Sequence, residues 1–190
     1  MTPMNPKIRR MARFFRVVFL IGMIASPLMV SIIWTNADVD TYGWMDVPFA
    51  FSEVADNMVR AGDVPNPLPM DIRVLSFAVT MLPVGVGMLA LFWLYRLFGH
   101  YAQGEIFTQD TVRLIRWLGW TLIASALVAP LHEALLSLVL SMHNSPGHHI
   151  LALSLDSAQI TTLVTGGVVL VVSWIMDEGR RLREADELTV

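Results

Sequence analysis

Four long apolar stretches dominate this chain of 190 residues. They cover approximately residues 14–34, 74–98, 114–142 and 158–176. An α-helix rises about 1.5 Å per residue, so about 20 apolar residues cross the hydrocarbon core of a bilayer, which is about 30 Å thick. Each stretch reaches or approaches that length. The sequence therefore predicts an all-α membrane protein with four transmembrane helices.

The composition also agrees with a protein that is embedded in a lipid bilayer. Apolar residues make up 55% of the chain, and the mean hydropathy is +0.58. A water-soluble helical protein would need a polar face on each helix, and these stretches have almost none. We therefore expect one integral membrane domain over residues 1–190, not a soluble domain.

Basic residues gather on one side of the predicted membrane. All but two of the 13 lysine and arginine residues lie in or beside the N-terminal segment, the 99–113 turn and the 177–190 tail. Cytoplasmic segments of membrane proteins carry such an excess of positive charge. We therefore expect both termini in the cytoplasm. The 35–73 and 143–159 loops would then lie on the outer side.

The short connections at 99–113 and 143–159 predict antiparallel neighbours and hence an up-down bundle of four helices. At the first connection, Gly104 breaks the chain and Thr108 is an expected N-cap for the third span.

Small residues spaced four apart indicate where helices approach closely. Gly22 and Ser26 have this spacing in the first span, and Thr162 and Gly166 have it in the fourth. Small side chains let helix backbones touch in lipid. These two seams would also permit a homo-oligomer, although they do not require one.

The 35–73 loop is acidic and contains one segment of helical period. Within Val47–Arg60, apolar residues recur on one side and charged residues on the other. This pattern predicts a short amphipathic helix that lies on the outer membrane surface or caps the bundle. The alternative is a lid that senses a ligand.

One line of polar residues lies inside the third span. His132 and Glu133 are ionisable, and Ser137 and Ser141 follow Glu133 at i+4 and i+8. A charge near the bilayer centre costs about 2.5–3.5 kcal/mol, so Glu133 should be protonated or face the bundle interior or a water-filled pocket. One interpretation is a proton, cation or small-ligand site of a small transporter or channel component. The other is a structural hydrogen bond between helices.

Sequence patterns of known catalytic and cofactor sites are absent. No phosphate-binding loop, dinucleotide fingerprint or nucleophile elbow occurs, and Leu136 occupies the place of the second histidine in a zinc-protease motif. The chain has no cysteine, and His143, His148 and His149 match no standard metal spacing. The basic clusters are short, and membrane orientation accounts for them. We therefore expect a non-enzymatic protein with no cofactor, no metal and no direct contact with nucleic acid.

Two segments on the predicted cytoplasmic side carry a resemblance to a known family. They read GEIFTQDTVRLIRWLGW at 104–120 and DEGRRLREADELTV at 177–190. They resemble a bacterial family of small four-helix membrane proteins, domain of unknown function 2975. Members of this family share three sequence motifs: a G-E-x-F-[ST] turn, an R-x-[IL]-G helix start and a D-[ED]-L-T-[IV] tail. The matching positions here are Gly104, Glu105, Phe107, Thr108, Arg116, Gly119 and residues 186–190.

The resemblance also suggests insertion in a bacterial inner membrane, and a role there. Such families are often encoded beside a small helix-turn-helix regulator, which implies a regulatory or signalling function through the cytoplasmic turn and tail. The residues expected to dock such a partner are Glu105, Phe107, Leu182, Glu184, Asp186, Glu187 and Leu188. The alternative is that these charges stabilise the turn and the last helix, through pairs such as Arg183–Glu187 at i+4.

Overall fold

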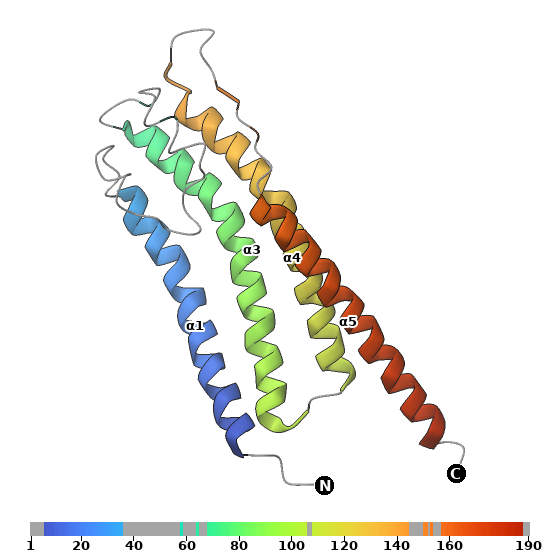
Figure 1. Cartoon of the computed structure of the whole chain (residues 1–190). Coiled ribbons are helices and arrows are strands. Elements are labelled where there is room, and N and C mark those ends of the chain that lie inside the picture. Colours follow the sequence, from blue (N-terminus) through green and yellow to red (C-terminus); the bar gives the residue numbers. More distant parts are fainter. Residues whose placement is uncertain are drawn as a thin grey trace.

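Four long α-helices make up nearly all of the described chain (Figure 1). The structure is a computed structural model that describes residues 6–35, 58, 64, 68–105, 108–144, 150–151, 153 and 157–187. The helices are α1 (Pro6–Thr35), α3 (Met70–Gln103), α4 (Gln109–Leu140) and α5 (Ser157–Glu187). These residues include no β-strand.

Each of the four helices is long and apolar enough to cross a membrane. The shortest candidate span, Ser157–Leu182, has 26 residues. At about 1.5 Å per residue it measures about 39 Å, more than the hydrocarbon thickness of about 30 Å. The prediction of four such helices is confirmed.

The helices continue past the limits predicted from hydropathy. The apolar stretch at 158–176, for example, is only part of α5, which runs on through charged residues to Glu187. A helix satisfies its backbone hydrogen bonds internally whether its side chains are apolar or charged. Hydropathy therefore marks the apolar part of each helix but not its ends.

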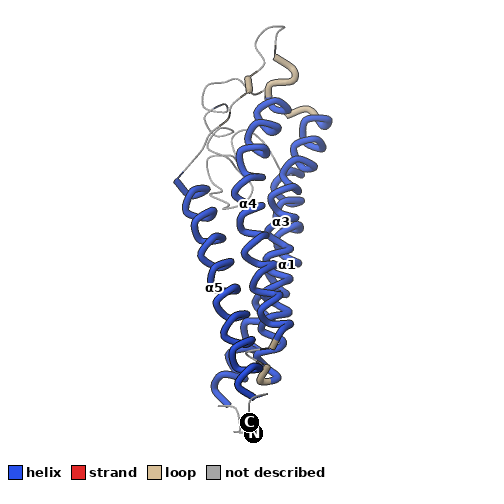
Figure 2. The backbone as a smooth tube through the Cα atoms, turned by 90° about the vertical axis from the view of Figure 1, so that its right-hand side faces the viewer, coloured by secondary structure: helices blue, strands red, loops and turns tan. Residues whose placement is uncertain are grey.

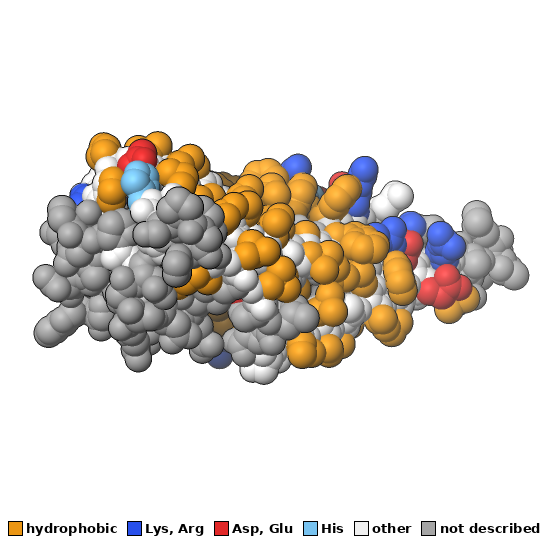
Figure 3. All heavy atoms as spheres, turned by 90° about the horizontal axis from the view of Figure 1, so that it is seen from above, with side chains coloured by type: hydrophobic (Ala, Val, Ile, Leu, Met, Phe, Trp, Pro, Cys, Tyr) orange, Lys and Arg blue, Asp and Glu red, His pale blue; other side chains and the backbone are white. Residues whose placement is uncertain are grey.

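Apolar side chains cover the flanks of the molecule. Figure 3 shows them over much of the described part of the visible face, with charged side chains gathered toward the end at which α5 finishes. Leu127, Val164 and Ile175 are among many large apolar residues that are exposed. Soluble monomers rarely expose so large an apolar surface, whereas lipid would cover it.

The helices form an open row. Among the described residues, only consecutive helices pack extensively, as α1 on α3, α3 on α4 and α4 on α5. Neighbours are antiparallel, as predicted, and the start of α1 and the end of α5 lie at the same end of the molecule (Figure 1). Figure 2 shows α4 between α5 and the pair of α1 and α3. Short connections set which helices are neighbours, but they do not bring the first helix against the last, so the expected bundle is not closed.

The turn between α3 and α4 follows from two residues. Gly104 has φ 91°, in the left-handed region that glycine adopts without strain, and the following Glu105 N–H donates to the His100 carbonyl at 3.0 Å. The Thr108 Oγ1 accepts from the Thr111 N–H at 3.3 Å and so caps α4. Both predictions for this turn are confirmed.

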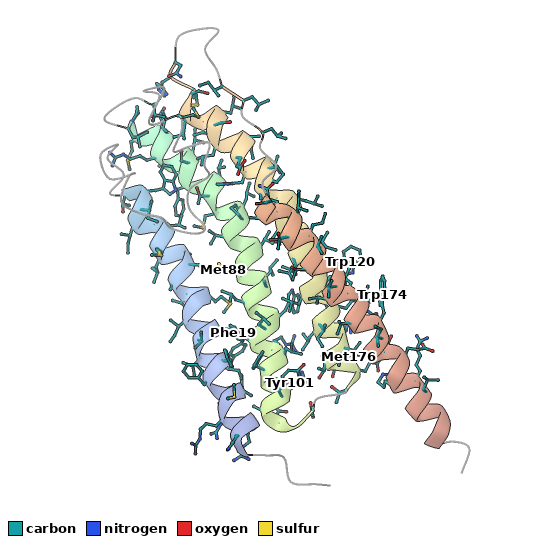
Figure 4. The ribbon with its side chains drawn as sticks, viewed as in Figure 1. Phe19, Met88, Tyr101, Trp120, Trp174 and Met176 are labelled. Carbon is teal, nitrogen blue, oxygen red and sulfur yellow. The ribbon has the colours of Figure 1, made fainter. Side chains whose placement is uncertain are left out.

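Aromatic residues and one arginine join α1 to α3. The ring of Phe98 lies 5.3 Å from that of Phe15 and 5.3 Å from that of Phe19, which Figure 4 labels. Beside them the Arg16 guanidinium donates to the Tyr95 hydroxyl at 2.9 Å and lies 4.5 Å from the centre of its ring. A cation over an aromatic face is attracted to it. These contacts fix α1 on α3 at the basic end.

Helices α4 and α5 approach each other closely at a seam of two glycines. A Cβ added to Gly166 would lie 3.1 Å from the Gly119 carbonyl oxygen, and one added to Gly119 would lie 2.8 Å from the Leu170 side chain. The backbones therefore touch here, as expected for Gly166. At Gly22 an added Cβ would make only an ordinary contact, 3.4 Å from Leu91.

This seam also sets how far α5 reaches along α4. Gly166 packs against Gly119 and Ile123, and α5 begins at Ser157, nine residues before Gly166. Because the two helices are antiparallel with the same rise per residue, α5 begins at about the level of His132. Figure 1 shows the start of α5 partway along α4. The last turns of α4 therefore extend beyond α5.

Beyond that level, a hydrophobic core joins α1, α3 and α4. Its buried members are Val30, Trp34, Met58, Val64, Leu68, Ile72, Val84, Leu136 and Leu140. Met58 and Val64 belong to the 35–73 loop, so part of that loop caps the core. The predicted amphipathic helix at Val47–Arg60 lies outside the described residues except for Met58, one of its apolar positions.

Candidate functional site

The polar line of α4 faces the protein. His132, Glu133, Ser137 and Ser141 are all buried, with Glu133 9% exposed, whereas the adjacent Leu131 is exposed. Since residues four apart share a helix face, the exposed leucine marks the opposite side of α4. The structure thus places the four residues together on the interior side, in the part of α4 that α5 leaves uncovered.

The two serines of this line bond to the backbone. Ser137 donates to the Ala134 carbonyl at 2.9 Å, and Ser141 donates to the Ser137 carbonyl at 2.8 Å. The Ile150 N–H in turn donates to the Ser141 Oγ at 3.1 Å. Ser141 therefore ties the end of α4 to the following loop, a structural role.

Among the described residues in this half of the molecule, two polar atoms are buried without a hydrogen-bond partner. They are the His132 Nε2 and the Ser76 Oγ. A buried polar group that lacks a partner costs about 1–3 kcal/mol, so a water molecule or ligand that bonded to either atom would be stabilised there. No group of three or more His, Cys, Asp or Glu residues that could hold a metal ion occurs in the described part of the chain.

Polar residues of α1 and α3 are also buried in the half of the molecule away from the basic end, and the sequence did not predict them. The Trp34 Nε1 donates to the Thr80 Oγ1 at 3.2 Å, and the Thr80 hydroxyl donates to the Ser76 carbonyl at 2.8 Å. Ser76 and Thr80 stand between Ile72 and Val84 at regular spacings of four, and all four are buried. This repeat of residues four apart was the sequence feature from which the buried face of α3 could have been predicted.

At the basic end, Asp177 joins α5 to α4. Its carboxylate lies 3.1 Å from the Arg116 Nη2 and 3.4 Å from the Arg180 Nη2, with Arg181 at 4.0 Å. Arg116 belongs to the 104–120 segment and Asp177 to the tail. The structure thus brings the two family-like segments together through a partly exposed ion pair, which solvent screens.

The α3–α4 turn holds Glu105 in place. Its carboxylate lies 2.7 Å from the His100 Nδ1, with about half of the Glu105 side chain exposed. Phe107, the other expected docking residue of the turn, lies outside the described residues. Glu105 is therefore already engaged within its own turn.

The expected docking residues of the tail lie on or just after the last turns of α5. Leu182 is 61% exposed. The backbone of α5 includes residues 183–187, but the described side chains end at Leu182, and Leu188 follows the last described residue. Helices α3 and α5 do not pack extensively on each other, so the turn and the tail are connected through α4.

Several tryptophans lie on α4 and α5 near the basic end. Trp117 and Trp120 of α4 and Trp174 of α5 are exposed, the last two labelled in Figure 4. The Trp117 ring also stacks on Trp93 of α3, with centroids 5.9 Å apart. Tryptophan is enriched at the membrane–water interface, so this level fits a headgroup region.

Of the three histidines at 143, 148 and 149, the structure describes only His143. The His143 Nε2 lies 3.4 Å from the Asp71 carboxylate at the start of α3. His148 and His149 lie outside the described residues.

One comparison with known proteins assigns a family. The family model for a protein of unknown function (DUF2975) matches residues 57–190. No curated protein and no solved structure matches the chain. The matched region covers more than half of the chain and includes both 104–120 and 177–190. The chain therefore belongs to the family of proteins of unknown function DUF2975.

Proposed function

We propose that this protein spans a bacterial inner membrane four times, with both termini in the cytoplasm, and acts in regulation or signalling without catalysis. Its output would pass through the cytoplasmic end of α5 to a helix-turn-helix regulator. The apolar flanks, the tryptophans and the basic residues at one end support the membrane part of this proposal.

The length of α5 supports a role for its cytoplasmic end. Its 31 residues measure about 46 Å, so about 16 Å of helix remain beyond a hydrocarbon core of about 30 Å. The protruding part carries the exposed Leu182 and Glu178, and its sequence continues with Glu184, Asp186 and Glu187. A helical extension with an apolar residue and an acidic end fits a basic partner.

Site-specific crosslinking tests this role. A photoreactive residue at Leu182 should capture a cytoplasmic protein with a helix-turn-helix domain, whereas the same residue at Leu163, within the apolar span, should not. Substitution of Glu184, Asp186 and Glu187 by lysine should abolish capture at Leu182. A tail truncation that leaves both the captured partner and the expression of neighbouring genes unchanged would refute the proposal.

A second candidate function rests on the polar line of α4. Glu133 is buried at a depth where charge is costly, and the His132 Nε2 next to it lacks a hydrogen-bond partner. These features favour a small transporter or channel component. Substitution of Glu133 by glutamine should then change a proton- or ion-dependent flux in proteoliposomes, and substitution of the exposed Glu178 by glutamine should not. Equal flux in both variants would exclude a role for Glu133.

A further inference from the structure

The first turns of α1 carry an uncompensated cluster of positive charge. Arg9, Arg10 and Arg13 are exposed there. The helix has no acidic residue anywhere between Pro6 and Thr35. Within the described part of the chain, no ion pair joins these three arginines to a carboxylate.

The location of the cluster makes this charge unfavourable in the isolated protein. The N-terminus of a helix carries a partial positive charge from the aligned peptide dipoles, which repels cations. Other arginines at the same end have partners: Arg116, Arg180 and Arg181 surround Asp177. The α1 cluster therefore has no counter-charge among the described residues, and an anion bound from outside would supply one.

Packing sets the depth of the cluster. Arg16, one turn further along α1, is bonded to Tyr95 of α3 and lies against Gly99, where an added Cβ would be 3.7 Å from its guanidinium carbon. Because α1 and α3 are antiparallel, the cluster lies beside the last turns of α3. The exposed Met11 and Phe14 lie next to these arginines in the helix. Such a pattern is typical of helices whose apolar side chains lie in the lipid while their arginine side chains extend to the headgroups.

We propose that Arg9, Arg10 and Arg13 form a binding site for the phosphates of anionic phospholipids in the cytoplasmic leaflet. Arginine binds phosphate oxygens with two parallel hydrogen bonds, which makes a cluster of arginines selective for phosphate. The inference rests on the membrane insertion in the proposed function but not on its regulatory role. The proposed lipid site is a property of the folded protein, whereas the effect of the same charges on membrane orientation acts during insertion.

The test is a titration of the full-length, delipidated protein in detergent with phosphatidylglycerol, phosphatidylcholine or inorganic phosphate, read out by native mass spectrometry. Phosphatidylglycerol should bind preferentially, and its affinity should fall as salt rises. Near an anionic surface each arginine is worth about fivefold in affinity. Inorganic phosphate that binds as tightly as the lipid would show a site for free phosphate and overturn the lipid proposal.

Substitutions locate the site. The double variant Arg9→Gln and Arg13→Gln should lose about 10- to 30-fold in affinity for phosphatidylglycerol, and Arg10→Gln alone about fivefold. The matched control, Arg180→Gln with Arg181→Gln, removes the same charge at the same end, where a carboxylate already compensates it, and should change little. An unchanged affinity in the first variant, or an equal loss in the control, would overturn the inference.

The same preparation separates this inference from the proposed function. A chain that is soluble without detergent would refute membrane insertion itself. A chain that needs detergent but binds phosphatidylcholine as well as phosphatidylglycerol would refute only the lipid site. The salt dependence of the wild-type protein needs no substitution, so a variant that fails to insert does not remove the test.

Discussion

The seam between α4 and α5 allows a stability prediction with a neighbouring control. A methyl group added at Gly166 would lie 2.9 Å from the Ile123 Cγ1, 3.1 Å from the Ile123 backbone nitrogen and 3.1 Å from the Gly119 carbonyl oxygen. At Gly167, the next residue, an added methyl group would meet nothing within 4 Å. The two positions therefore differ in packing while sharing the same helix.

Substitution of each glycine by alanine separates packing from helix propensity. Alanine is favoured over glycine in a helix by about 1 kcal/mol, and this gain should be similar at both positions. At Gly166 the clash involves backbone atoms, which cannot turn aside, so the helices must move apart. Overpacking of this kind costs about 1–3 kcal/mol. We expect Gly166→Ala to be less stable than Gly167→Ala by about that amount.

The assay is unfolding in detergent micelles by increasing SDS, followed by circular dichroism. The prediction concerns the difference in the free energy of unfolding between the two variants, because the gain in helix propensity is similar in both and cancels. Equal unfolding midpoints for Gly166→Ala and Gly167→Ala would show that the close approach at this seam does not contribute to stability. Gly119→Ala, whose methyl group would lie 2.8 Å from the Leu170 side chain and 3.2 Å from the Gly166 carbonyl oxygen, should also be less stable than Gly167→Ala.

Three further substitutions test individual contacts. Ser141→Ala removes the acceptor of the Ile150 N–H and should destabilise the loop after α4 by about 1 kcal/mol; hydrogen exchange should then speed up at Ile150 and remain unchanged in α1. Trp34→Phe keeps an aromatic ring but loses the bond to Thr80 and leaves part of a buried site unfilled, so unfolding in SDS should report a loss of at least about 0.6 kcal/mol. An unchanged midpoint would show that the indole N–H has an equivalent partner elsewhere. Arg16→Met removes the cation from the α1–α3 seam and should cost about 0.5–2 kcal/mol, with the loss unchanged by salt because the contact is partly buried.

Local rules predicted the parts of this fold that depend on neighbouring residues. The length of each apolar stretch predicted a helix, because the requirement for internal hydrogen bonding in lipid leaves few alternatives. Gly104 and Thr108 predicted the α3–α4 turn, because a left-handed backbone and a side-chain cap are properties of single positions.

Contacts between helices were harder to predict. The small-residue spacing identified Gly166, but nothing in the sequence said that Gly119 would lie opposite it. Trp34 and Thr80 were missed because each is unremarkable on its own helix and gains meaning only from the register of α1 on α3. The open row was missed for the same reason, since connection length carries no information about helices that are distant in the chain.

The polar line of α4 and the tail of α5 lie near opposite ends of α4, and this distance determines how the two candidate sites can be tested. Glu133 and Arg116 are 17 positions apart on this helix, or about 26 Å at 1.5 Å per residue. Helix α5 packs at the level of Arg116 but begins only near Glu133, so it leaves the polar line uncovered. Substitutions at Glu133 should therefore leave partner capture at the tail unchanged, and changes in the tail should leave flux unchanged. If both properties change together, α4 must move as a rigid element that couples the two ends, and the protein would be a transmembrane signal transducer.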